Sequence, residues 1–340
     1  MSEPINLIKT IFFNDEEEFR CGWRVLIFFV LYVAIFLLIN AVVFLLSALV
    51  PALKPLLTIS TERPAAEWRE LFGFMLYNAG SLLAVLAANA ICARALEHRS
   101  FLSTGFALHK GWLRDFVWGL VLGATTLTVA VAIAAASGAT TFNVQVSGIN
   151  FLVFAFIVLA ITFLISAANE EAMVRGFAFQ ALTHNIGAPI ALLITSTIFG
   201  VLHLGNPSVS FFSTLNTILA GVWLGVAYLM TRSLWLATAL HASWNFVMVF
   251  VFGLPVSGIV FYKNFGWFAG ESPHWSWLSG GIYGPEGGAA ATVALIVCTL
   301  VIWKSGLFST SKEMVEAIKH GKRQPEMTRL FAKETDDGLQ

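Results

Sequence analysis

Residues 167–175 read Ala-Ala-Asn-Glu-Glu-Ala-Met-Val-Arg, and they place two carboxylates and a guanidinium inside one of the most apolar regions of the chain. An ionisable side chain at membrane depth costs at least about 2.5 to 3.5 kcal/mol, so such residues are by default candidates for a function. Here Glu170, Glu171 and Arg175 fall within a single helical turn and a half. The stretch therefore predicts a membrane-embedded helix that carries a polar site.

The composition of the whole chain indicates the same class of protein. Of its 340 residues 57% are hydrophobic and only 12% are charged, and the mean hydropathy is +0.78. These values exclude a soluble globular domain and predict an all-α polytopic membrane protein whose main partner is the lipid bilayer. The formal net charge is zero and no nucleic-acid-binding signature is present. We therefore expect no nucleic acid among its partners.

A membrane span needs about 20 mainly apolar residues. Candidate spans are residues 25–50, 71–95, 116–136, 149–182, 190–203, 211–230, 234–254 and 289–303, which makes about eight transmembrane helices. The run 149–182 is too long for one straight crossing of a hydrocarbon core of about 30 Å, so part of it must leave the span. The glycine pairs Gly119 with Gly123 and Gly221 with Gly225 have the small-xxx-small spacing that lets helices approach closely.

The distribution of lysine and arginine predicts the orientation. With the N-terminus in the cytoplasm, most of the 20 basic residues fall on the cytoplasmic side, and Lys54, Arg63, Arg69 and Lys263 remain outside. Both termini are then cytoplasmic, as an even number of crossings requires. The predicted organisation is a cytoplasmic N-terminal segment (1–24), a membrane-embedded helical domain (25–303) and a cytoplasmic tail (304–340).

Two segments outside the spans have a distinct composition. Residues 255–287 are rich in Gly, Pro, Trp and Tyr, and we expect an outer-face loop that rests on lipid headgroups. In the tail, Met314 and Ile318 are one helical turn apart, which would permit a weak interfacial helix. We expect the tail to be mostly solvated.

Helical geometry separates the three charged residues of the opening stretch. Glu171 and Arg175 are four positions apart, share one face and can form an ion pair, whereas Glu170 points about 100° away. Glu170 is then the carboxylate left free to act as a base. The alternative is that all three residues form one ion network that locks helices together, and for Glu171 and Arg175 this alternative stays open.

Two further pairs of polar and aromatic residues are one turn apart on later spans, namely Phe199 with His203 and His241 with Asn245. Glu170 and His203 are about equally many residues away from the turn at 184–189. If the two helices run antiparallel from this turn, both residues should lie at the same depth in the membrane. Histidines can position a water or transfer a proton, and an asparagine amide can stabilise an oxyanion. This combination predicts hydrolysis by an activated water.

Other hydrolytic chemistries lack their motifs. The sequence contains no His-Glu-x-x-His and no Gly-x-Ser-x-Gly, and no aspartate falls inside a predicted span. Ser243 shares a helix with His241 but faces elsewhere.

The motifs Glu170-Glu171-x-x-x-Arg175, Phe199-x-x-x-His203 and His241-x-x-x-Asn245 together resemble those of the CPBP family. This is the CAAX protease and bacteriocin-processing family, also called the type II CAAX prenyl endopeptidase or Abi family. The resemblance covers roughly residues 100–250. It implies an eight-helix membrane fold with a cavity open toward the cytosol, and for bacterial members a place in the cytoplasmic membrane.

Carried over from the family, Glu170 would be the general base, His203 its partner, and His241 and Asn245 would hold the water or stabilise the oxyanion. Glu171, Arg175 and Phe199 would be supporting residues. We expect no tightly bound metal. The alternative is zinc or another divalent metal on Glu170, His203 and His241.

The sequence thus predicts an intramembrane endopeptidase that acts on a membrane-associated peptide or protein. A second hypothesis is a non-catalytic bacteriocin self-immunity or scaffold protein with the same fold. A third is a proton-coupled transporter, because buried carboxylates and histidines also form proton relays. Against the transporter, no paired interrupted helices occur at corresponding positions of two halves.

Overall fold

The computed structural model describes residues 10–14, 18–50, 53–54, 63–65, 68–145 and 148–319. Within these ranges six helical segments are long and apolar enough to cross a membrane, by length and composition. They are α2 (Cys21–Leu49), α4 (Trp68–Glu97), α5 (Trp112–Ala136), α6 (Ile149–Arg175) with α7 (Phe177–Ile186), α9 (Phe211–Thr231), and α10 (Leu234–Phe246) with its continuation to Val251. Two shorter apolar helices are α8 (Ala188–Leu202) and α12 (Ala289–Lys304). The prediction of an all-α polytopic membrane protein is confirmed.

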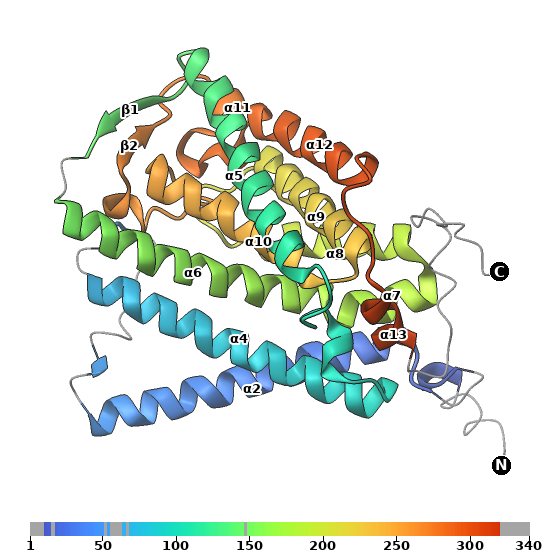
Figure 1. Ribbon diagram of the computed structural model, residues 1–340. Coiled ribbons are helices and arrows are strands. Elements are labelled where there is room, and N and C mark those ends of the chain that lie inside the picture. Colours follow the sequence, from blue (N-terminus) through green and yellow to red (C-terminus); the bar gives the residue numbers. More distant parts are fainter. Residues whose placement is uncertain are drawn as a thin grey trace.

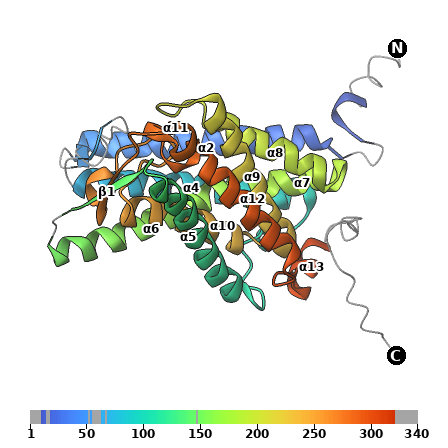
Figure 2. The same cartoon turned by 90° about the horizontal axis from the view of Figure 1, so that it is seen from above.

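The helices form two groups that meet along α6. Helices α2, α4 and α6 follow one another across one part of the molecule, and α5, α8, α9, α10 and α12 make up the rest (Figure 1). Seen from above, α2 and α5 lie on opposite sides with α9 between them (Figure 2). The N-terminal end of α2 and helix α13 (Lys312–Lys319) lie at the same end of the bundle (Figure 1). An even number of crossings requires this arrangement, whereas the cytoplasmic location of both ends stays a prediction.

The long apolar run beginning at Ile149 is interrupted, as its length demands. Helix α6 ends at Arg175 and α7 begins at Phe177, with Gly176 between them. Asn89 of α4 fills the break, because its side-chain oxygen accepts the Phe177 N–H at 2.7 Å and its amide donates to the Ala172 carbonyl at 3.1 Å. A Cβ atom at Gly176 would lie 2.3 Å from that Asn89 oxygen. The glycine thus lets α4 satisfy the backbone groups that the interruption frees.

Close helix contacts occur where the glycine pairs predicted them. A Cβ on Gly123 of α5 would lie 2.2 Å from Ser243 Oγ and 2.3 Å from the Leu240 carbonyl of α10. A Cβ on Gly221 of α9 would lie 2.8 Å from Ser196 Cα of α8. Ser243 bonds to backbone carbonyls of α5 and α10, so it faces away from the histidine beside it, as expected. These contacts bring α5 close to α10 and α9 close to α8.

The 255–287 loop differs from the expected headgroup-resting segment. Its tryptophans are exposed as expected, with Trp267, Trp275 and Trp277 between 51% and 64% accessible. Tyr262, Phe265 and Tyr283 are instead 2–4% exposed and join the protein interior. Strand β2 (Phe268–Glu271) of this loop pairs antiparallel with β1 (Thr141–Val144), which precedes α6, and helix α11 (Ser276–Ser279) follows. Part of the loop is therefore packed into the fold, because several of its aromatic side chains contact apolar residues of the helices.

The first part of the tail is also packed rather than solvated. Phe308, Met314 and Ile318 are at most 6% exposed, and α13 contacts the 3-10 turn Phe101–Thr104. The apolar face of α13 is covered by protein, which corrects the expectation of a mostly solvated tail over this part. Residues 320–340, and residues 1–9 and 15–17 of the predicted N-terminal segment, lie outside the described residues.

Candidate active site

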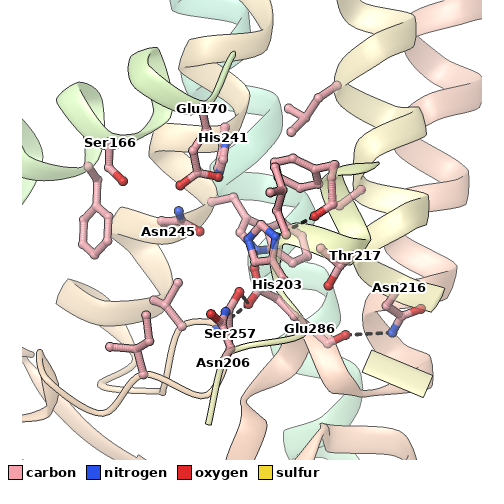
Figure 3. A pocket seen from close by; sticks show the side chains of 18 of the residues that line it. Ser166, Glu170, His203, Asn206, Asn216, Thr217, His241, Asn245, Ser257 and Glu286 are labelled. Carbon is pink, nitrogen blue, oxygen red and sulfur yellow. Dashed lines mark hydrogen bonds and ion pairs between the residues drawn. The ribbon is translucent and has the colours of Figure 1, made fainter. Parts of the chain in front are cut away.

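A cavity of about 470 Å³ lies between α6, α8, α9 and α10, with walls from α2, α4 and the 255–287 loop. Glu170, His203, His241 and Asn245 all line it (Figure 3). Their neighbours in the lining include Tyr32, Asn78, Phe163, Ser166, Phe199, Asn206, Asn216, Thr217, Trp223, Trp244, Ser257, Tyr262 and Glu286. The structure thus brings together the four residues that the sequence singled out, although they come from three different helices.

Local structure sets the direction of each histidine. His203 is the C-cap of α8, and its Nδ1 lies 2.7 Å from the Phe199 carbonyl one turn earlier. A carbonyl only accepts hydrogen bonds, so Nδ1 of His203 carries the proton and Nε2 is left for the cavity. His241 and Asn245 are one turn apart on α10, whose backbone changes to π-helix at Val247–Val251 directly afterwards. Such π turns are frequent at functional sites.

The nearest ionisable partner of Glu170 is His241. Oε2 of Glu170 lies 3.8 Å from Nε2 of His241, and within the described part of the chain Glu170 forms no ion pair with His203. The expectation that Glu170 meets His203 across a hairpin is corrected in this respect. Counting residues from the turn placed both at the cavity, but it left out α10, whose His241 stands beside Glu170. His203 lines the same cavity and packs on Phe199, as His241 does (Figure 3).

Glu171 and Arg175 form the predicted ion pair and are both completely buried. Nη1 of Arg175 lies 3.1 Å from Oε1 of Glu171, and Nη2 donates to the Gly221 carbonyl of α9 at 2.9 Å. The same Glu171 oxygen lies 3.0 Å from Nδ1 of His241, a contact that the sequence did not predict. The pair therefore does more than neutralise itself, since it joins α6 to α9 and to α10. The alternative hypothesis of an ion network that locks helices applies to these two residues.

Phe199 packs against Arg175 of the ion pair and against both histidines. Its ring centroid lies 4.7 Å from Cζ of Arg175, 4.7 Å from the His203 ring and 6.0 Å from the His241 ring. With 3% exposure it is part of the packed wall. Its aromatic ring thus supports the guanidinium by a cation–π contact and packs on both imidazoles.

Sequence reasoning missed two lining residues, both in the 255–287 loop. Tyr262 packs on Phe163, with ring centroids 5.0 Å apart, and burial together with the charge of Glu170 raises the pKa of its phenol. Glu286 accepts hydrogen bonds from Trp244 Nε1 at 3.1 Å and from the backbone N–H and hydroxyl of Ser257, each at 2.6 Å. Nothing in the local sequence marks either residue, because only the folded loop brings them to the cavity.

The residues considered as metal ligands are not arranged as a metal site. Glu170 and His241 are close, but among the described residues no three His, Cys, Asp or Glu side chains form a group that could hold a metal ion. The zinc alternative finds no matching geometry. The expectation of no tightly bound metal stays a prediction.

Comparison with known protein families gives one match. Residues 151–247 match the family model described as type II CAAX prenyl endopeptidase Rce1-like. The matched segment begins in α6, ends just after Asn245 and contains all three motifs. It thereby agrees with the resemblance stated from the motifs. No curated protein and no solved structure matched the chain in the same comparisons.

Proposed function

We propose that this multi-pass membrane protein is an intramembrane endopeptidase that hydrolyses a peptide bond with a water activated by Glu170. The observation that carries the proposal is the relation of Glu170 to His241. These side chains approach within 3.8 Å at the wall of a cavity of about 470 Å³. The family match to endopeptidases over this segment supports the same reaction class.

The protonation states implied by the contacts explain how a water would be activated. Nδ1 of His241 faces a carboxylate oxygen of Glu171 and so carries a proton. In the proposed reaction the ring is neutral when water binds, so that its Nε2 is an acceptor. The Glu170 carboxylate is also an acceptor, and its Oε2 has no hydrogen-bond partner within the described residues. Oε2 of Glu170 and Nε2 of a neutral His241 are both acceptors, so they cannot form a hydrogen bond with each other. A water that donates one hydrogen to each would present its lone pair to the substrate carbonyl.

Glu170 would take the proton of this water as it attacks the carbonyl carbon. Negative charge then develops on the carbonyl oxygen, where the side-chain amide of Asn245 is a donor in the lining. The proton held by Glu170 passes to the leaving amine when the C–N bond breaks. His241 keeps its orientation throughout, because Glu171 holds its other nitrogen.

The substrate in this proposal is a membrane-associated protein or peptide, and we place the enzyme in a bacterial cytoplasmic membrane with both termini in the cytoplasm. The test compares the N- and C-termini of the membrane proteome in cells with the wild-type protein and with Glu170→Gln. Termini that appear only with the wild type identify substrates. Glu271→Gln, at an exposed position on β2 that is 60% accessible in its side chain, is the matched control and should behave as the wild type.

The outcome separates the proposal from the other function classes. If Glu170→Gln folds and produces the same termini as the wild type, peptide hydrolysis by this carboxylate is excluded. A Glu170→Gln variant that still protects cells against a bacteriocin would instead indicate the non-catalytic immunity function.

A further inference from the structure

The 255–287 loop forms one wall of the cavity. This wall carries a second carboxylate, that of Glu286, which has no part in the proposed hydrolysis. Glu286 lines the cavity together with Asn206, Asn216 and Ser257, whereas Glu170 lines it from α6 (Figure 3). The charged or imidazole side chains in the lining are Glu170, His203, His241 and Glu286. The cavity therefore presents acidic groups and histidines to whatever enters it.

Glu286 is held firmly in one orientation. The indole of Trp244 and the backbone and hydroxyl of Ser257 donate three hydrogen bonds to its two oxygens. The amide of Asn216 on α9 donates to the backbone carbonyls of Glu286 and Gly288, at 2.9 and 3.0 Å, which fixes the residue's main chain. A carboxylate offers about four lone-pair positions, so one remains available after these three bonds.

The charge of Glu286 is not neutralised by the protein. Within the part of the chain that the structure describes, its carboxylate forms no ion pair with a lysine, arginine or histidine. All three of its hydrogen-bond donors are neutral groups. A fixed, partly desolvated carboxylate without a cation favours a positively charged ligand, since charge-assisted hydrogen bonds are about twice as strong as neutral ones.

Glu286 lines the same cavity as Asn245, which is the amide donor of the proposed reaction. It also bonds to Trp244, the residue before Asn245 on α10. A peptide bound in this cavity with its carbonyl at Asn245 would direct a neighbouring side chain to the wall that carries Glu286. An acidic neighbour at that position would be repelled, because like charges at close range disfavour binding.

We propose that Glu286 forms a specificity subsite that binds a lysine or arginine side chain, or a free amine, next to the bond that is cut. The position of the subsite next to a cleaved bond rests on the proposed function, whereas the binding of a cationic group to Glu286 does not. The subsite selects a cationic residue inside an otherwise apolar segment of the substrate.

The test measures binding and cleavage separately, on the full-length protein in nanodiscs of uncharged phosphatidylcholine. The probes are two fluorescent peptide mixtures with blocked ends and apolar residues at all positions except one, which is lysine in one mixture and Nε-acetyl-lysine in the other. Binding is measured by fluorescence anisotropy on the Glu170→Gln background, so that cleavage does not interfere. We expect the lysine mixture to bind about tenfold more tightly.

Three variants decide whether Glu286 causes this preference. Glu286→Gln removes the charge and should bind both mixtures equally, Glu286→Asp keeps the charge and should retain part of the preference, and Glu271→Gln should retain all of it. Size-exclusion elution and thermal unfolding establish that each variant is folded. The subsite is overturned if the Glu170→Gln protein binds the two mixtures equally, if it binds neither, or if Glu286→Gln keeps the preference.

The cleavage measurement tells apart the failure of each proposal. Suppose that the wild type binds lysine peptides through Glu286 but shows no more cleavage of them than Glu170→Gln does. The subsite then stands and the endopeptidase does not. If the wild type cuts both mixtures at equal kcat/KM, the endopeptidase stands and the subsite does not.

Discussion

Oε1 of Glu171 lies 3.0 Å from Nδ1 of His241 in the apolar interior between α6 and α10. The neighbouring Glu170 approaches the other nitrogen of the same ring at 3.8 Å. Two consecutive glutamates of one helix thus contact opposite sides of one imidazole, one from the packed interior and one from the cavity. A carboxylate behind a functional histidine fixes both the ring orientation and the position of its proton.

This division predicts unequal effects on stability when each glutamate becomes glutamine. Glu171→Gln leaves Arg175 as a buried cation without its counter-charge, so the free energy of unfolding should fall by about 3 to 5 kcal/mol. Glu170→Gln, whose side chain faces the cavity, should cost less than about 1 kcal/mol. Denaturant unfolding in mild detergent micelles measures both, and equal losses would contradict the assignment of Glu171 as the structural partner.

A second prediction concerns the contact of α5 with α10. In Gly123→Ala the new Cβ would lie 2.3 Å from the Leu240 carbonyl, so the helices must move apart and stability should fall by about 1 to 3 kcal/mol. Gly22→Ala in the first turn of α2 is the control, because no atom lies within 4 Å of the added Cβ. Thermal unfolding should leave the control at or slightly above the wild type and place Gly123→Ala below it.

Much of this arrangement could be predicted from the sequence, and the limits have physical reasons. Helical spacing was sufficient to predict the ion pair of Glu171 with Arg175, because both residues belong to one helix. The partner of Glu170 could not be derived in this way, since residue counts give depth along a helix but not which of several helices lies beside it. The choice of His241 over His203 depends on how α10 packs, and glycine contacts such as that of Gly123 determine this packing.

The 255–287 loop shows the other limit. Its composition predicted aromatic side chains at the membrane interface, and the exposed tryptophans agree with this. Tyr262 and Glu286 have the same kind of sequence neighbours, yet the folded loop carries them to the cavity. Periodicity and motif spacing carry no information about such residues, because a loop has no repeating geometry.

A third prediction follows from Tyr262. Burial and the charge of Glu170 raise the pKa of its phenol, so the hydroxyl stays protonated and remains a hydrogen-bond donor throughout the physiological range. Tyr262→Phe should lower kcat for peptide cleavage about tenfold if this donor assists the reaction. The shape of the pH profile between about pH 6 and 9 should be unchanged, because the lost group does not titrate there. A profile that loses its alkaline limb in Tyr262→Phe would contradict the raised pKa.

A fourth prediction concerns metal removal. Because Glu170, His203 and His241 do not form a metal-binding group, incubation with EDTA or 1,10-phenanthroline should leave the cleavage rate of the purified protein unchanged. The Glu170→Gln variant on the same substrate provides the baseline for complete loss. Inactivation by the chelators that zinc reverses would contradict the metal-free mechanism and favour a rearranged site.

The pairing of β1 with β2 has a consequence for how the molecule responds to force and to crosslinking. The two strands tie the start of α6, which carries Glu170, to the loop that carries Tyr262 and Glu286. The sheet therefore limits movement of the loop relative to the segment that precedes α6. A covalent staple across this small sheet would restrict that movement without altering any residue that lines the cavity.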